Sequence, residues 1–387
     1  MRHALSQRCY DESIRMMSWF FRNRVNTSNH YHCEFLVTLL DLGAWLHASA
    51  HNYLSILAME SEMPQIYPQR HQLKYTRKQY RVRNWNEYET GLRRRGDLTI
   101  WFAEDSFQDW HSAAGKKPGG QQRYSDAAIE AALTVRLVYG LALRQTEGFL
   151  RSIAELLHLN IGIPDHSTLS RRSARLPRGN VGSVAASGPV QILIDSTGLT
   201  MHRGSAPPED KRNRRSWRKL HLVVDAKSAE ILTAKVTTHD TRDSTPVPQL
   251  LAPVNREFAS VMADSAYDRA SVYDAIDNHV LHKSHSGTKI VIPPGRNARL
   301  GEDHGVVNDQ RDKNIRHIAR VGRRKWQKES RYNQRSLVET AMSRFKNEFG
   351  DGLRSRTMQT QVTEVRIACT ILNTMTRLGM PDGHCVT

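Results

Sequence analysis

Apolar residues in the middle of the chain recur at helical spacing. Ile129, Leu133 and Leu137 follow one another at steps of four residues, Gly140 then interrupts, and a second apolar stripe runs through Phe149, Ile153 and Leu157. Steps of this length place side chains on one face of a helix, and glycine is a natural interruption. The pattern predicts two amphipathic helices between residue 126 and about residue 157.

A third helix is predicted to follow Pro164. Asp165 or Ser167 can cap its first turn, because a short oxygen-bearing side chain accepts hydrogen bonds from the free backbone N–H groups at a helix start. Polar and basic side chains then stand near that start: Ser167, Thr168, Arg171 and Arg172. This arrangement suits the second helix of a helix-turn-helix DNA reader. It equally suits a packing helix with a solvated basic face.

The pattern changes to strands after a linker rich in Gly, Ser and Ala. Apolar runs at 220–224 and 231–236 flank a turn-like segment and predict a hairpin. Further runs at 191–194, 261–263 and 290–292 alternate with helical segments near 246–251 and 269–278. A hairpin followed by alternating strands and helices predicts a mixed α/β sheet. We therefore expect a helical DNA-binding domain over 71–180 and an α/β catalytic domain over 188–380, closed by a helix over 362–378.

Residues 1–70 are rich in His, Ser, Asn and Met and show no sustained period. We expect an atypical N-terminal extension that is loosely folded. The alternative is that translation begins at an internal methionine such as Met63, so that the preceding residues are not native.

Composition favours a polyanionic partner and a reducing compartment. Lys and Arg total 56 against 39 Asp and Glu, a formal charge of +17, which is typical of nucleic-acid binding but shared by other protein classes. The four cysteines show neither disulfide-framework nor zinc-site spacing. Residues 42–59 carry no formal charge but contain many polar side chains, so we expect no membrane span and a cytoplasmic protein.

Two aspartates directly follow apolar runs. Asp195 ends Ile-Leu-Ile-Asp, and Asp264 ends Val-Met-Ala-Asp. Strand ends in α/β sheets are where ligands and metals gather. Either aspartate alone is weak support for catalysis, because an Asp in this position often only caps a turn.

A third acidic residue lies in a more specific pattern. Tyr332, Arg335, Glu339 and Lys346 are separated by steps of three, four and seven residues. At about 100° per residue, one helix would present all four side chains within roughly 60° of arc. The alternative is a surface helix carrying an ordinary Arg335–Glu339 pair, which contributes only a few tenths of a kcal/mol.

The three acids together have a common chemical explanation. Carboxylates converging within about 4 Å would repel one another by several kcal/mol unless cations lay between them. Their hard oxygens suit Mg²⁺ or Mn²⁺. Two such ions stabilise the attacking and leaving oxygens of a displacement at phosphorus. Arg335 and Lys346 would then hold DNA phosphates.

These residues resemble the DDE transposases of bacterial insertion sequences, and particularly the insertion-sequence-five family. The signature Tyr-x2-Arg-x3-Glu-x6-Lys is matched at every specified position by Tyr332, Arg335, Glu339 and Lys346. Further similarity covers about residues 72–383, through segments 95–101, 124–126, 143–145, 164–172, 195–199, 217–222, 264–268 and 292–294.

The resemblance implies an RNase H-like catalytic fold. Asp195 would lie on its first strand, Asp264 after its fourth and Glu339 on a later helix, and these three would be the catalytic and metal-binding residues. It also implies recognition of the element's terminal inverted repeats, cleavage that exposes 3'-hydroxyls, and their joining to double-stranded target DNA. We expect a homo-oligomer on DNA, with two Mg²⁺ or Mn²⁺ ions and no membrane.

Two basic runs flank the proposed site. The first contains Lys211, Arg212, Arg214 and Arg215, and the second extends over 311–331. We expect both to contact the DNA backbone. The rival interpretations are a repressor without catalytic activity, and a nuclease of the same fold that cuts without joining.

Overall fold

The computed structural model describes residues 79–101, 109–112, 122–177, 181, 188–201, 217–282, 287–295, 297–301 and 309–386. Several expectations lie outside these residues: the extension 1–70, the segment 42–59, and the basic residues Lys211, Arg212, Arg214 and Arg215. Across the described ranges, no helix is both long and apolar enough to cross a membrane.

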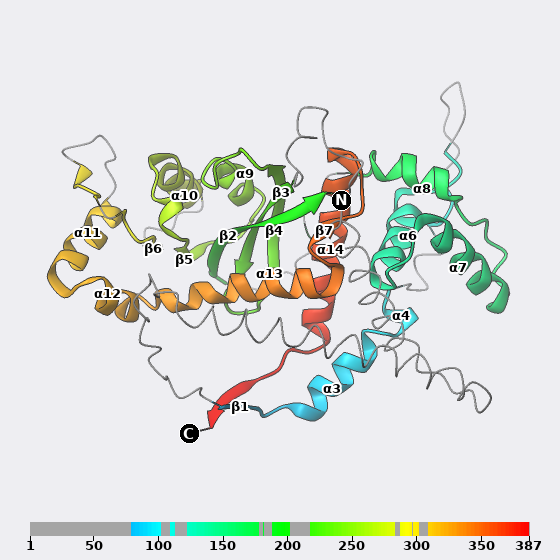
Figure 1. The fold of residues 1–387 in the computed structure, drawn as a ribbon, viewed down its shortest axis with the longest axis horizontal. Coiled ribbons are helices and arrows are strands. Elements are labelled where there is room, and N and C mark those ends of the chain that lie inside the picture. The colour runs from blue at the N-terminus through cyan, green and yellow to red at the C-terminus, as the bar shows by residue number, and fades with distance from the viewer. Residues whose placement is uncertain are drawn as a thin grey trace, which may run out of the picture. The chain divides into compact units, whose positions relative to one another are not determined.

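A mixed sheet forms the centre of the described chain (Figure 1). Its strand order is β4-β3-β2-β5-β6, and β7 pairs with the far end of β2. Strands β2, β3 and β4 are antiparallel, whereas β5 and β6 run parallel to β2. The predicted mixed α/β sheet and its first hairpin are confirmed. The strands are β2 (Val190–Met201), β3 (Trp217–Asp225), β4 (Ile231–Thr238), β5 (Phe258–Met262), β6 (Lys289–Val291) and β7 (Gly352–Leu353).

Helices cover both faces of the sheet because side chains alternate along each strand. In β2, Leu193 and Leu199 join one apolar cluster and Ile192 and Ile194 join the other. The first cluster is completed by α13 (Ser336–Phe349) and α14 (Met358–Leu378), and the second by α9 (Val247–Leu251) and α10 (Ala270–His282). In Figure 1, α9 and α10 lie on one side of the sheet and α13 on the other.

Helices α6 (Asp126–Val138), α7 (Leu143–Leu156) and α8 (His166–Ser173) lie between residue 122 and the sheet. Ser125 caps α6 by accepting a hydrogen bond from the Ala128 N–H at 3.0 Å. Gly140, at φ +66°, separates α6 from α7, as its position in the sequence predicts. Both α6 and α8 pack against α14, so these helices and the sheet share one hydrophobic core.

The two ends of the described chain meet in a small sheet that the sequence did not predict. Strand β1 (Gln79–Val82) pairs antiparallel with β8 (Gly383–Val386). The Asn84 side chain donates to the Met380 carbonyl at 3.0 Å and accepts from the Asp382 N–H at 2.8 Å. Helices α3 (Trp85–Arg94) and α4 (Leu98–Trp101) follow β1.

The segment before α13 departs from the single helix expected over 332–346. Helices α11 (Asp309–Val321) and α12 (Arg323–Glu329) are followed by the 3-10 turn η4 (Tyr332–Arg335), and the α-helix begins only at Ser336. Arg331 adopts the left-handed conformation at φ +59°. The chain therefore bends immediately before Tyr332, and the next residues wind more tightly than an α-helix.

Candidate active site

Three separate elements position the predicted acids. Asp195 lies within β2, which is longer than the predicted strand and continues past it. Asp264 directly follows β5 and caps the short 3-10 turn η2 (Ser265–Tyr267) by accepting from the Ala266 N–H at 2.8 Å. Glu339 lies in the first turn of α13. The three acids therefore come from a strand, a strand end and a helix.

The guanidinium of Arg335 connects these acids. It donates to Asp195 Oδ2 at 2.6 Å and also to the Glu339 carboxylate. The negative charge of Asp264 acts on the same guanidinium. The Asp195 side chain is 15% exposed, whereas that of Glu339 is 54% exposed. The cluster is thus buried on the strand side and open to solvent on the helix side.

Burial and charge oppose each other at Asp195. Burial raises the pKa of Asp195, and the nearby charge of Asp264 raises it further. The Ser196 N–H, which donates to Asp195 Oδ1 at 2.8 Å, and the Arg335 guanidinium act in the other direction without overcoming the rise. The protein thus holds Asp195 in surroundings that disfavour its charge, which is common at functional sites.

Tyr332 and Arg335 form a pair beside the acids. The Arg335 guanidinium lies 5.9 Å from the centre of the Tyr332 ring. Burial disfavours the charged guanidinium, but Tyr332 and the surrounding carboxylates outweigh burial and raise the pKa of Arg335. Burial raises the pKa of the Tyr332 hydroxyl, which therefore stays protonated at neutral pH. Although η4 is not α-helical, Arg335 remains in contact with Glu339.

The donor set fits a divalent cation in its chemistry. Hard carboxylate oxygens are the ligands that such ions prefer, and two of these carboxylates, Asp195 and Glu339, contact one positive charge, the Arg335 guanidinium, on which the charge of Asp264 also acts. Among the residues that the structure describes, no three His, Cys, Asp or Glu side chains are already arranged around a shared metal position. A bound ion would therefore require the guanidinium to move aside.

Comparison with known proteins assigns the chain to a family. Two profiles described as "Transposase DDE domain" match it, one over residues 93–203 and the other over residues 186–374. This chain belongs to the DDE transposases. Asp195, Asp264 and Glu339 all lie within the matched segments. The family generally uses divalent metal ions.

One solved structure is similar to part of the transposase. It is described as "Cryo-EM structure of piggyBac transposase synaptic complex with hairpin DNA (SNHP)". The two sequences are 10% identical, and the match covers 72% of this chain and 73% of that chain with a TM-score of 0.31.

A polar network that sequence reasoning missed supports the transposase site from the opposite face of β2. Ser196 Oγ donates to Asp243 Oδ1 at 2.9 Å, and Lys219 Nζ donates to the same oxygen at 3.0 Å. Burial raises the pKa of Tyr267, as do the charges of Asp195 and Asp243. The sequence signal that could have located this network is the alternation of side chains along β3, which places Lys219 opposite Gly198 of β2.

Helix α8 presents fewer free side chains than its sequence suggests. Asp165 caps it and accepts hydrogen bonds from the hydroxyls of Ser167 and Thr168 at 2.5 and 2.9 Å. Arg171 is exposed. Arg172, in contrast, is buried, and its guanidinium donates to Asp126 at 2.5 Å. The expectation that Arg172 contacts DNA is corrected, because this side chain is committed to an internal ion pair.

The remaining candidates have simpler surroundings. Lys346 lies on α13 two turns beyond Glu339, is partly exposed, and forms no ion pair with any residue in the described ranges. Trp217 is partly buried and packs near Gly198, where an added Cβ would approach the indole ring within 3.2 Å. Asp268, four residues after Asp264, accepts from Arg311 at 2.9 Å and fixes α11 to the loop that follows β5.

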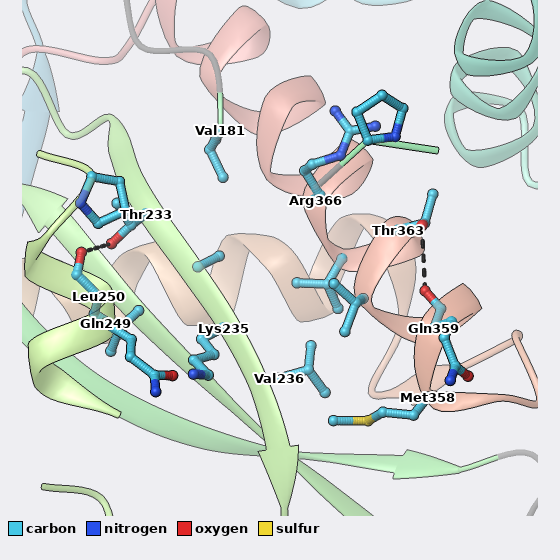
Figure 2. Close-up of a pocket in the computed structure, with 15 residues that line it drawn as sticks. Val181, Thr233, Lys235, Val236, Gln249, Leu250, Met358, Gln359, Thr363 and Arg366 are labelled. Atoms are coloured by element: carbon cyan, nitrogen blue, oxygen red, sulfur yellow. Dashed lines mark hydrogen bonds between the residues drawn. The ribbon is translucent and has the colours of Figure 1, made fainter. Parts of the chain in front are cut away.

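A separate cavity of about 460 Å³ lies between β4, α9 and α14 (Figure 2). Thr233 on its wall donates to the Leu250 carbonyl at 2.8 Å, and Arg366 forms a two-pronged ion pair with Glu130. Burial lowers the pKa of Lys235, a further lining residue. No residue of the acidic cluster lines this cavity, so it does not belong to the candidate active site.

Proposed function

We propose that this chain is an RNase H-like transposase of the insertion-sequence-five group. It binds the terminal inverted repeats of its element, cuts DNA to expose 3'-hydroxyls, and joins them to target DNA. The observation that carries the proposal is the contact of Arg335 with both Asp195 and Glu339, together with the charge of Asp264 that acts on the same guanidinium. Their elements are the first strand of the sheet, the end of its fourth strand and a later helix, as the resemblance implies.

Asp195, Asp264 and Glu339 are the proposed ligands of two Mg²⁺ or Mn²⁺ ions. Such ions, when bound, stabilise the attacking and leaving oxygens of an in-line displacement at phosphorus. The protein contributes carboxylates held by three different elements and partly shielded from water. Shielding strengthens their interaction with any cation, because charges attract more strongly where the effective dielectric is low.

Arg335 and Lys346 are the proposed phosphate-binding residues of the site. Without metal ions, Arg335 offsets the negative charge of the carboxylates. When divalent cations offset that charge instead, the planar guanidinium of Arg335 is suited to donate two hydrogen bonds to the oxygens of a phosphate. Lys346 projects from α13, which begins directly after Arg335, and forms no ion pair with a described residue. Tyr332 is proposed to orient the Arg335 guanidinium, because its ring lies 5.9 Å from it.

Helix α8 is the proposed reader of the element ends, in a helix-turn-helix with α7. Arg171 is exposed, and Ser167 and Thr168 stand at the helix start where such helices meet base edges. Replacing Arg171 with Gln should weaken binding to element-end DNA. If Arg171 contacts a phosphate, the slope of log affinity against log salt should become shallower by about one unit. If it reads a base, discrimination against unrelated DNA should fall instead by about 1–3 kcal/mol.

The central test uses DNA that carries the inverted repeats flanking the coding region. Asp195→Asn, Asp264→Asn and Glu339→Gln should each retain binding and lose cleavage by on the order of a thousandfold or more. Asp240→Asn is the matched control, because Asp240 is exposed and lies outside the cluster. Cleavage that survives in the Asp195→Asn protein would overturn the proposal.

A second assay separates joining from cutting. DNA ends supplied with a ready 3'-hydroxyl should be joined to a target plasmid by the wild-type protein with Mg²⁺ or Mn²⁺. Efficient cutting with no joined product would identify a nuclease instead. Size-exclusion measurements on the DNA complex would test the proposed homo-oligomer.

A further inference from the structure

Helices α11 and α12 form a compact pair between the sheet and the catalytic helix. They follow β6 and lead through η4 into α13. Gly322, at φ +81°, makes the sharp turn that joins them. In Figure 1 the pair lies at the β6 end of the sheet, and α13 extends from it along the sheet.

The inward side of this helix pair is hydrogen-bonded to the loop after β5 and to the segment that contains β6. Arg311 donates to Asp268 at 2.9 Å, four residues beyond Asp264. Asn314 and Arg323 donate to the carbonyls of Ile290 and Pro294, at 3.0 and 2.7 Å.

The same helix pair also packs against η4, the turn that carries Arg335, through aromatic rings. Trp326 is 1% exposed, and its ring centre lies 5.9 Å from that of Tyr332. The helix pair thus connects to the loop of the second acid and to the turn that carries Arg335.

The outward side carries rows of cations. Lys313, Arg316 and Arg320 follow at steps of three and four on α11, and exposed cations continue through α12 and the next turn at Arg324, Lys328 and Arg331. None of these six side chains forms an ion pair with a described residue. Two of the nearby acids are engaged elsewhere, since Asp312 is buried beside Arg311 and Glu329 pairs with His317 at 2.8 Å. The third, Asp309, is exposed at the start of α11 and forms no ion pair with a described residue.

We propose that these outward rows bind the backbone phosphates of duplex DNA as it enters the active site. Like charges three or four residues apart destabilise a helix by a few tenths of a kcal/mol each, and Asp309, four residues before Lys313, is the one exposed acid of α11 that can offset them. Successive cations in each row rise by about 5 Å along the helix, which suits a backbone with phosphates along its length. The inference rests on the proposed function. Because the helix pair is anchored to the loop that follows Asp264, DNA bound by its cations would be the same DNA that the active site cuts.

Contacts of this kind are independent of sequence. They should therefore contribute equally to binding of element ends and of unrelated duplexes, in contrast to contacts made by α8. This difference separates the proposed surface from the proposed end reader.

The test compares two double variants of the full chain. Lys313→Gln with Arg316→Gln removes one lysine and one arginine from the α11 row. Lys227→Gln with Arg83→Gln removes the same charges from the β3–β4 turn and from the turn after β1, where both side chains are exposed and neither forms an ion pair with a described residue. The measurement is the slope of log affinity against log salt for a duplex without element sequence.

The α11 variant should lower that slope by about two units and weaken binding about tenfold or more at 100 mM salt. The control should change the slope by less than half a unit, and exchanging the cations as Lys313→Arg with Arg316→Lys should preserve it. Equal slopes for the α11 variant and the control would overturn the inference, as would weaker binding to duplex RNA with unchanged binding to DNA. Cleavage by the wild-type protein and its loss in Asp195→Asn are scored in parallel, so failure of this surface is distinguishable from failure of the proposed function.

Discussion

Arg335 sets the charge balance of the active site at the scale of single residues. Its guanidinium contacts Asp195 and Glu339 and interacts electrostatically with Asp264. Without a cation, three neighbouring carboxylates would repel one another by several kcal/mol in total at an effective dielectric near 20. The identity of each acid could be predicted from its position in the sequence. Their connection through one arginine could not, because spacing along a helix does not describe contacts across to a strand.

The charged form of Asp195 should lower the stability of the folded protein at neutral pH, and substitution by asparagine should reveal this effect. Its raised pKa means that the folded state holds the proton more tightly than the unfolded state does. The associated stability is present below the ordinary pKa of an aspartate and is lost as pH rises through the folded pKa. Asp195→Asn should therefore melt at a higher temperature than wild type at pH 7, and the gap should close towards about pH 4.

Asp274→Asn, at an exposed position on α10, is the control and should show no such gap. Melting curves followed by circular dichroism from pH 4 to pH 8 make the comparison. An Asp195→Asn protein that melts below wild type at pH 7 would contradict the argument. The expected gain illustrates the exchange of stability for activity that active sites often show.

Neighbouring arginines on α8 should respond in opposite ways. Arg172 is buried and donates to Asp126 and to the Tyr124 carbonyl, so Arg172→Gln should lower the free energy of unfolding by about 2 kcal/mol. Arg171 is exposed, so Arg171→Gln should leave it within about 0.5 kcal/mol and affect DNA binding instead. Urea unfolding measures both. Equal stabilities for the two variants would show that the ion pair of Arg172 contributes little.

At the scale of elements, strand and helix positions were more predictable than their ends. The apolar runs located β3, β4 and β6 because their interior positions are buried. The sequence did not predict that η4 interrupts the helix before Ser336, since this depends on the left-handed backbone of Arg331. The pairing of β1 with β8 also could not be predicted, because it joins segments some 300 residues apart and has no periodic signal.

The contact of α3 with the end of α14 depends on one glycine. A Cβ added to Gly91 would lie 2.5 Å from the carbonyl oxygen of Leu378. Gly91→Ala should destabilise the protein by about 1–3 kcal/mol through the forced shift, even though alanine favours a helix by about 1 kcal/mol. Gly148→Ala on α7 is the matched control, because nothing lies within 4 Å of its added Cβ. Thermal melts should move down for the first variant and slightly up for the second.

At the scale of the molecule, α14 unites the helical segment with the sheet. Its apolar residues pack on α6 and on β4, and Arg366 pairs with Glu130 at 2.8 Å. The sequence predicted two domains that meet near residue 185, but it could not indicate a shared core, because burial between distant segments is not visible in local periodicity. A DNA end held by α8 would consequently stand at a fixed position relative to the acids.

The charge of the whole chain predicts how DNA binding responds to salt. A formal charge of +17, with free cation rows on α11 and α12, favours contacts to several phosphates at once. Each neutralised phosphate releases bound counterions, so log affinity falls by about 0.9 per contact for each unit of log salt. If six or more phosphates are neutralised, raising salt from 50 to 200 mM should weaken binding roughly a thousandfold. Fluorescence anisotropy with a labelled duplex provides the measurement, and uncharged dextran at matched viscosity is the control. A slope shallower than about two would contradict a phosphate-dominated footprint, because so few contacts could not hold a duplex against the competing ions.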